Sequence, residues 1–196
     1  MSSIFDLIQS QLGRTEISEL SRSIGADEST TQSAIGAALP ALLGALNRNT
    51  DRPGGAGALQ SALTRDHDGS ILDDVAGHFA GRSSGKSADG AGILGHLFGG
   101  KQDMIAAGLA KTTGTDSGAM TSMLGKLAPV VMGALGKQQR QGGLDASALS
   151  SLLTGERREM EKRDSNAGGL MAKLFDQDGD GDLDLGDLAS GIGRLF

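Results

Sequence analysis

Apolar residues recur every three or four positions along most of the chain, which is the spacing of one face of an α-helix. No stretch shows the strict alternation of apolar and polar residues that is typical of a half-buried strand. The pattern therefore predicts an all-α fold. The expected helices span residues 4–12, 17–24, 28–46, 58–63, 71–79, 93–98, 104–112, 117–137 and 146–153.

Several residues mark where these helices begin and end. Gly25 follows the second apolar stripe and should end it, since glycine is favoured just after a helix. Asp27 stands where an N-cap would begin the long third helix. Pro40 lies inside that helix, so we expect a kink or a break near Leu39. The polar segment 81–90, GRSSGKSADG, is typical of a linker or an exposed loop.

The chain contains an internal repeat. A shift of 89 residues superimposes matching residues without a gap, which predicts two related helical units at about residues 1–80 and 91–154. The matched pairs are Leu20 with Leu109, Gly25 with Gly114, Asp27 with Asp116, Ser33 with Ser122, Gly36 with Gly125, Pro40 with Pro129, and Gly44-Ala45-Leu46 with Gly133-Ala134-Leu135. We interpret the repeated glycines as places where the two proline-bearing helices pack closely against each other.

Composition supports a helical core. Of 196 residues, 38% are apolar, yet the aromatic residues are five Phe only, and the chain has no Trp, Tyr or Cys. The absence of Cys excludes disulfides, thiol catalysis and Cys-ligated zinc. The methionines Met120, Met123 and Met132 lie at helical spacing and are expected in the core. No basic stripe or aromatic platform indicates nucleic-acid binding.

Three motifs together resemble a known family: DGSILDDVAGHF (68–79), GILGHLFGGKQ (92–102) and GTDSGAMTSMLGKLAPVVMGALGKQ (114–138). They are similar to the YidB-like bacterial family, catalogued as Domain of Unknown Function 937. The resemblance covers about residues 1–155 and implies an all-helical domain. It implies no established activity, so it transfers no catalytic residue. Residues 156–196 lie outside it and form a charged connector, beginning ERREMEKRD, and a tail.

The tail carries the strongest chemical signal, because six of the 24 acidic residues lie between Asp176 and Asp187. The rest of the chain then has 18 acidic and 18 basic residues, so the net charge of −6 belongs to this segment. Numbered from the first aspartate, carboxylates stand at loop positions 1, 3, 5, 9 and 12, and position 7 offers its backbone carbonyl. The expected metal ligands are Asp176, Asp178, Asp180, Asp182, Asp184 and Asp187.

This spacing predicts a calcium-binding helix–loop–helix of the EF-hand or dockerin type, with Mg²⁺ as an alternative occupant. Gly181 stands at position 6, where the loop turns sharply, and Leu183 at position 8, where an apolar residue anchors it. Position 12 is Asp187 instead of the EF-hand glutamate, so weaker binding is expected than in a sensor EF-hand. No intact second loop is present.

Other polar residues are given structural interpretations. The histidines His67, His78 and His96 form no metal-binding spacing and are expected at the surface or at helix ends. The acidic residues of segment 66–73 lack the ligand count of a calcium loop, and Asp68-Gly69 is expected to be a turn before a helix. Gly85-Lys86-Ser87 lacks the first glycine and the strand of a phosphate loop, so nucleotide binding is not expected.

The sequence thus predicts a duplicated helical bundle with a C-terminal calcium-binding appendage, acting as a binding or scaffolding module and not as an enzyme. A homo-oligomeric structural protein packing through Gly/Ala-rich helices is the main alternative, and a metal-dependent hydrolase is a weaker one. The expected partner is an unidentified protein or a second copy. No signal peptide is visible, and the longest uncharged apolar stretch, 33–46, is too short for a membrane span. Cytoplasmic location is the default expectation, and non-standard export stays open.

Overall fold

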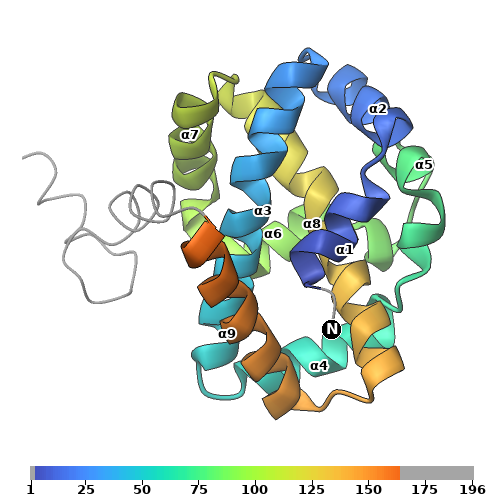
Figure 1. The fold of residues 1–196 in the computed structure, drawn as a ribbon, viewed down its shortest axis with the longest axis vertical. Coiled ribbons are helices and arrows are strands. Elements are labelled where there is room, and N and C mark those ends of the chain that lie inside the picture. The colour runs from blue at the N-terminus through green and yellow to red at the C-terminus, as the bar shows by residue number, and fades with distance from the viewer. Residues whose placement is uncertain (1–2, 164–196) are drawn as a thin grey trace, which may run out of the picture. The chain divides into compact units, whose positions relative to one another are not determined.

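The computed structural model describes residues 3–163, and within them every regular element is a helix. The chain divides into two compact units, Met1–Arg157 and Arg158–Phe196, and the first is a helical bundle (Figure 1). The helices are α1 (Ile4–Gln11), α2 (Arg14–Ile24), α3 (Glu28–Asp51), α4 (Gly55–Asp66), α5 (Val75–Phe79), α6 (Gly90–Phe98), α7 (Gln102–Thr113), α8 (Ser117–Gly142) and α9 (Ala146–Arg163), with short 3-10 turns η1 (Ser70–Asp74), η2 (Lys86–Ala88) and η3 (Gly99–Lys101).

The predicted helix boundaries at the start of α3 are confirmed. Gly25 ends α2 in the left-handed conformation at φ 72°, where a side chain would be strained. Asp27 caps α3, and its carboxylate accepts a hydrogen bond from the amide of Thr30 at 2.9 Å. Asp116 caps α8 in the same way, since it accepts from the amides of Gly118 and Ala119.

The central helix is α8, which packs against α3, α6 and α7 and lies beside α3 in Figure 1. Its inward side chains are almost completely excluded from water, and they include Met120, Met123 and Met132 at 0%, 0% and 5% exposure. The prediction that these methionines belong to the core is confirmed. Burial of this apolar face drives the packing of the surrounding helices.

Pro40 does not break α3, which runs without interruption from Glu28 to Asp51. Of the two expectations near Leu39, a break is therefore wrong. A proline ring collides with the carbonyl of the residue four positions earlier, and that residue is Gly36. Glycine has the backbone freedom to move this carbonyl aside, so the helix continues. Gly125 stands in the same relation to Pro129 in α8.

The expected role of the repeated glycines is wrong for α3. Nothing lies within 4 Å of the positions that side chains at Gly36 and Gly44 would occupy. The close approaches are made on α8 and with other partners. A Cβ added to Gly90 at the start of α6 would overlap the backbone of Gly125, and one at Gly136 would overlap the carbonyl oxygen of His67.

A buried carboxylate from late in the chain fastens the first helix. Glu156 of α9 is 8% exposed and accepts hydrogen bonds from the amides of Ile4 at 2.9 Å and Phe5 at 3.3 Å. The hydroxyl of Ser3 donates a third at 2.6 Å. Amides of the first helical turn have no partner within the helix, so an anion satisfies them and complements the helix dipole. The charged connector expected from residue 156 thus begins with a buried structural residue.

One helix of the described part, α8, is long and apolar enough to cross a membrane. The sequence analysis missed it because Lys126 interrupts the uncharged stretch. In the bundle, 67% of its most apolar window is buried by other helices, as in the core helix of a helical protein.

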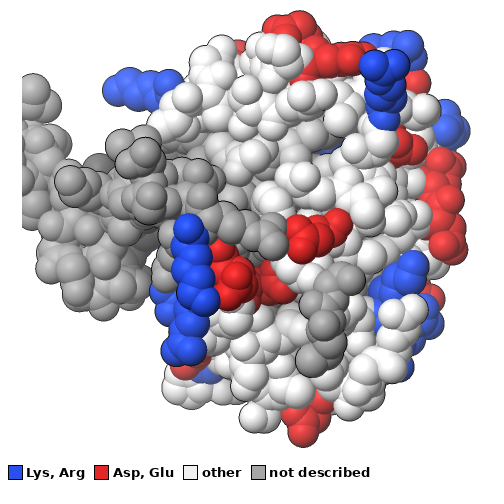
Figure 2. All heavy atoms as spheres, in the orientation of Figure 1, with Lys and Arg blue, Asp and Glu red and all other residues white. Residues whose placement is uncertain are grey.

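On the face in Figure 2, acidic and basic side chains are interspersed around uncharged residues.

Candidate functional site

The predicted calcium ligands, Asp176, Asp178, Asp180, Asp182, Asp184 and Asp187, lie outside the residues that the structure describes. Within residues 3–163, no group of three or more His, Asp or Glu side chains is arranged to hold a metal ion. Asp68 and Gly69 lie in the turn between α4 and η1, as expected. In it the Asp68 carboxylate accepts a hydrogen bond from the amide of Ser70 at 3.0 Å.

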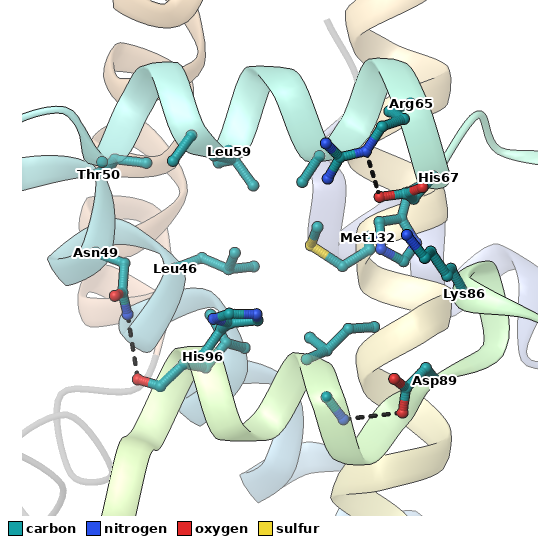
Figure 3. Close-up of a pocket in the computed structure, with 17 residues that line it drawn as sticks. Leu46, Asn49, Thr50, Leu59, Arg65, His67, Lys86, Asp89, His96 and Met132 are labelled. Carbon is teal, nitrogen blue, oxygen red and sulfur yellow. Dashed lines mark hydrogen bonds and ion pairs between the residues drawn. The ribbon is translucent and has the colours of Figure 1, made fainter.

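The bundle contains a cavity of about 520 Å³ between α3, α4 and α6 (Figure 3). Small-molecule sites in proteins commonly enclose about 300–1,000 Å³, so this volume suits a ligand of modest size. The 3-10 turn η2 and the middle of α8 complete the lining. None of these elements carries a motif that predicted a site here.

Apolar side chains from four helices form most of the wall. They come from the C-terminal half of α3, one face of α4, one face of α6 and the centre of α8. The main contributors are Leu46, Leu59, Ala62, Ile93, Leu97 and Met132. The small residues Ala58 and Ala62, one helical turn apart on α4, leave the space that larger side chains would fill.

One end of the cavity is charged. Arg65 Nε lies 2.9 Å from Asp66 Oδ2, and this hydrogen bond is the main cause that lowers the pKa of Asp66. Lys86 extends toward the same pair from η2 (Figure 3), and its positive charge lowers the pKa of Asp66 further. This end of the cavity therefore places two cations, Arg65 and Lys86, beside the carboxylate of Asp66.

Two other polar residues of the lining are already used by the helices. Asp89 caps α6, and its carboxylate accepts a hydrogen bond from the amide of Gly92 at 2.9 Å. Asn49 donates to the carbonyl of Leu97 at 3.1 Å and so ties α3 to the end of α6 (Figure 3). Both side chains shape the cavity while their main hydrogen bonds stay within the protein.

All three histidines lie at helix ends, as predicted, but two of them are buried. His67 and His78 are 7% and 6% exposed, and the Nδ1 atom of each has no hydrogen-bond partner. His78 Nε2 lies 3.0 Å from the carbonyl oxygen of Lys126. Burial lowers the pKa of both rings, so both are neutral at pH 7. His67 and the exposed His96 line the cavity.

The cavity therefore combines largely apolar walls with a buried neutral imidazole and charged side chains at one end. Sequence analysis missed it because its lining is assembled from five separate segments, none with a recognisable spacing. The one retrospective signal is Lys86, which belongs to the Gly-Lys-Ser sequence rejected as a phosphate loop. A lysine in such a sequence is consistent with an anionic ligand, but the residues around Lys86 in the sequence do not indicate the apolar side chains that surround it in the fold.

Sequence comparison places the bundle in a known family. The profile described as bacterial protein of unknown function (DUF937) matches residues 6–138, which is more than half of the chain. No curated protein and no solved structure gives a significant match. The match agrees with the resemblance read from the three motifs, and it leaves the acidic tail outside. The chain therefore belongs to the bacterial family of unknown function DUF937.

Proposed function

We propose that this protein binds calcium through its C-terminal loop and acts as a binding or scaffolding module whose tail is ordered by the ion. The observation that carries the proposal is the spacing of Asp176, Asp178, Asp180, Asp184 and Asp187 around Gly181. Calcium takes six to eight oxygen ligands, and carboxylates at these loop positions converge on one centre in EF-hand loops.

The position of the loop in the chain supports the proposal. The family match ends at residue 138 and the first compact unit ends at Arg157, so the acidic tail lies outside both. Six carboxylates within twelve residues repel one another, and a divalent cation removes this repulsion. A segment of this charge density therefore gains more from an ion than any other part of the chain.

The proposed mechanism is local. Bound calcium neutralises the aspartates and allows the flanking apolar residues to form helices on either side of the loop. The segment after the loop would then present an apolar face made of Leu188, Ile192, Leu195 and Phe196. This face is the proposed contact for a protein partner, and its formation makes the contact calcium-dependent.

Isothermal titration calorimetry on the full chain tests this proposal. The wild type should give a saturable heat with one calcium per chain, and Asp176→Ala/Asp180→Ala should abolish it. Asp68→Ala/Asp73→Ala is the matched control, because it removes the same charge from the acidic turn of the bundle and should leave the heat unchanged. Negligible heat in the wild type at millimolar calcium would remove the site.

A second candidate function, self-association, is favoured by one observation. Gly36 is exposed on α3, and no atom lies within 4 Å of the side-chain positions at Gly36 and Gly44. A second helix can approach such a surface closely, as the homo-oligomer alternative requires. Light scattering with and without calcium distinguishes the two functions. A monomer in both states rejects self-association, and an oligomer that Gly36→Leu dissociates supports it.

A further inference from the structure

We propose that the cavity between α3, α4 and α6 binds a medium-chain carboxylate, with its hydrocarbon chain against the apolar walls and its head at Lys86. This site is independent of the calcium loop, and it lies entirely within the first unit of the chain. The proposal depends on three features of the cavity, namely its apolar lining, the charge at one end, and a buried imidazole.

The apolar lining favours a hydrocarbon chain over a polar ligand. Side chains of Leu46 of α3 and Leu59 of α4 face the cavity (Figure 3), and Ile93 of α6 also lines it. A sugar or a nucleotide would leave its hydroxyl groups without partners against such walls. Each methylene group that leaves water for this surface should strengthen binding by about fourfold.

The charge at one end selects an anionic head. The guanidinium of Arg65 is held by Asp66 at 2.9 Å, so their charges cancel. The Asp89 carboxylate faces the amides at the start of α6 and accepts the Gly92 hydrogen bond. Lys86 is exposed, acts on Asp66 only through its charge without a direct ion pair, and is the cation that a ligand can reach. An ammonium group at the mouth of an apolar cavity pairs with a carboxylate and disfavours a cationic ligand.

His67 is the third and independent feature. Its side chain is more than nine-tenths buried, it lines the cavity beside Lys86 (Figure 3), and its Nδ1 has no hydrogen-bond partner. Buried polar atoms in folded proteins nearly always have a partner. When Nδ1 carries the proton of the neutral ring, it can donate a hydrogen bond to a water molecule. That water in turn bridges to the carboxylate of the bound ligand. A neutral ring also allows the hydrocarbon to lie against it.

The first experiment is calorimetry of the full chain with octanoate, decanoate and dodecanoate, each below its micelle concentration. Saturable binding with one ligand per chain is expected, and affinity should rise about fourfold for each added methylene. The neutral ester methyl decanoate should bind about tenfold more weakly than decanoate, because it cannot pair with Lys86.

Variants then locate the ligand. Lys86→Ala should weaken decanoate by about tenfold and leave methyl decanoate unchanged, whereas Lys111→Ala, an exposed lysine on α7 outside the cavity, should change neither. Ala62→Phe should fill the cavity and abolish binding of both ligands. Ala58→Phe does the same from the more exposed edge of α4, in case Ala62→Phe fails to fold. Ala107→Phe on the exposed side of α7 controls for an added aromatic ring.

Four outcomes would overturn the proposal. The first is an absence of saturable binding by the wild type for all three carboxylates. The second is unchanged affinity in a folded Ala58→Phe variant, which would place the ligand elsewhere. Equal losses in Lys86→Ala and Lys111→Ala would show a general effect of charge. Equal affinities for decanoate and its methyl ester would show that the head is not recognised as an anion.

Discussion

The helices α3 and α8 carry the same sequence element, G-x-x-[LA]-P-x-x-x-G-A-L, in two different surroundings. In α8, a side chain at Gly133 would meet Ile71 of η1, and one at Gly136, just beyond the element, would meet the backbone of His67. In α3, Gly44, which corresponds to Gly133, faces open space, and so does Gly36. The repeated sequence is shared, but the close packing of its glycines is not.

The difference separates two reasons for a glycine in a helix. Gly36 and Gly125 each stand four residues before a proline, where a free backbone helps the helix to accommodate the ring. This requirement is local and is the same in both helices. The close approaches on α8 depend on which segments cover it, and those segments cannot be identified from the element itself. A glycine motif in a helix therefore indicates a requirement of its own backbone more directly than it indicates a close contact with another segment.

The largest expected effect is at the tightest approach. Gly136→Ala should lower the free energy of unfolding by about 3 kcal/mol, because the new methyl group meets backbone atoms of His67 that have no side-chain freedom to move away. Urea unfolding followed by circular dichroism measures this loss. Gly95→Ala on the exposed side of α6 is the control, since nothing lies within 4 Å of its Cβ position. Equal stability of the two variants would contradict the assigned approach.

The next effect concerns α1, which packs on α8 and is held by Glu156. Glu156→Ala should cost about 2 kcal/mol, because it leaves the amide of Ile4 without its side-chain acceptor and the amide of Phe5 with only the Ser3 hydroxyl. Hydrogen exchange measured by mass spectrometry should be faster in the variant than in the wild type, and this increase should be larger in residues 4–11 than elsewhere. Glu159→Ala, three residues further along α9, is the control, because it removes the same charge from the same helix. Similar exchange of residues 4–11 in both variants would show that Glu156 does not hold α1 in place.

A paired substitution tests the central comparison directly. Gly133→Ala should lose about 1–2 kcal/mol of stability, since its methyl group must displace the side chain of Ile71. Gly44→Ala, at the matching position of α3, should gain about 0.5–1 kcal/mol, because alanine restricts the unfolded chain and meets nothing in the folded one. Urea unfolding measures both changes in the free energy of unfolding. Changes of opposite sign support the comparison, and changes of the same sign would contradict it.

Sequence reasoning succeeded where the cause was local. Gly25 and Asp27 fix a helix boundary through their own backbone and side-chain chemistry, and the methionines of α8 follow helical spacing. It failed where the partner was distant. Glu156 could not be distinguished within a run of mixed charges, because the amide that it binds is 152 residues away. The cavity was missed for the same reason, since Leu46 and Ile93 meet only in the folded bundle.

The smallest effect is a dependence of stability on pH, and it arises where α8 meets buried imidazoles. Burial lowers the pKa of His67 and His78 below the ordinary value of 6.5. As pH falls below 6.5, the unfolded chain binds protons that the folded chain does not, so the free energy of unfolding decreases until the lowered pKa of the folded state is reached. The effect is small because Asp66 favours the charged form of His67, and the hydrogen bond to the Lys126 carbonyl favours that of His78.

Comparison with a variant isolates this contribution from the carboxylates, which also titrate as pH falls. Urea unfolding of the wild type at pH 7.5 and pH 5.5 should show a larger loss of stability at the lower pH than His67→Asn/His78→Asn shows, since asparagine does not titrate. A loss of the same size in the wild type and the double variant would mean that neither buried ring gains a proton on unfolding.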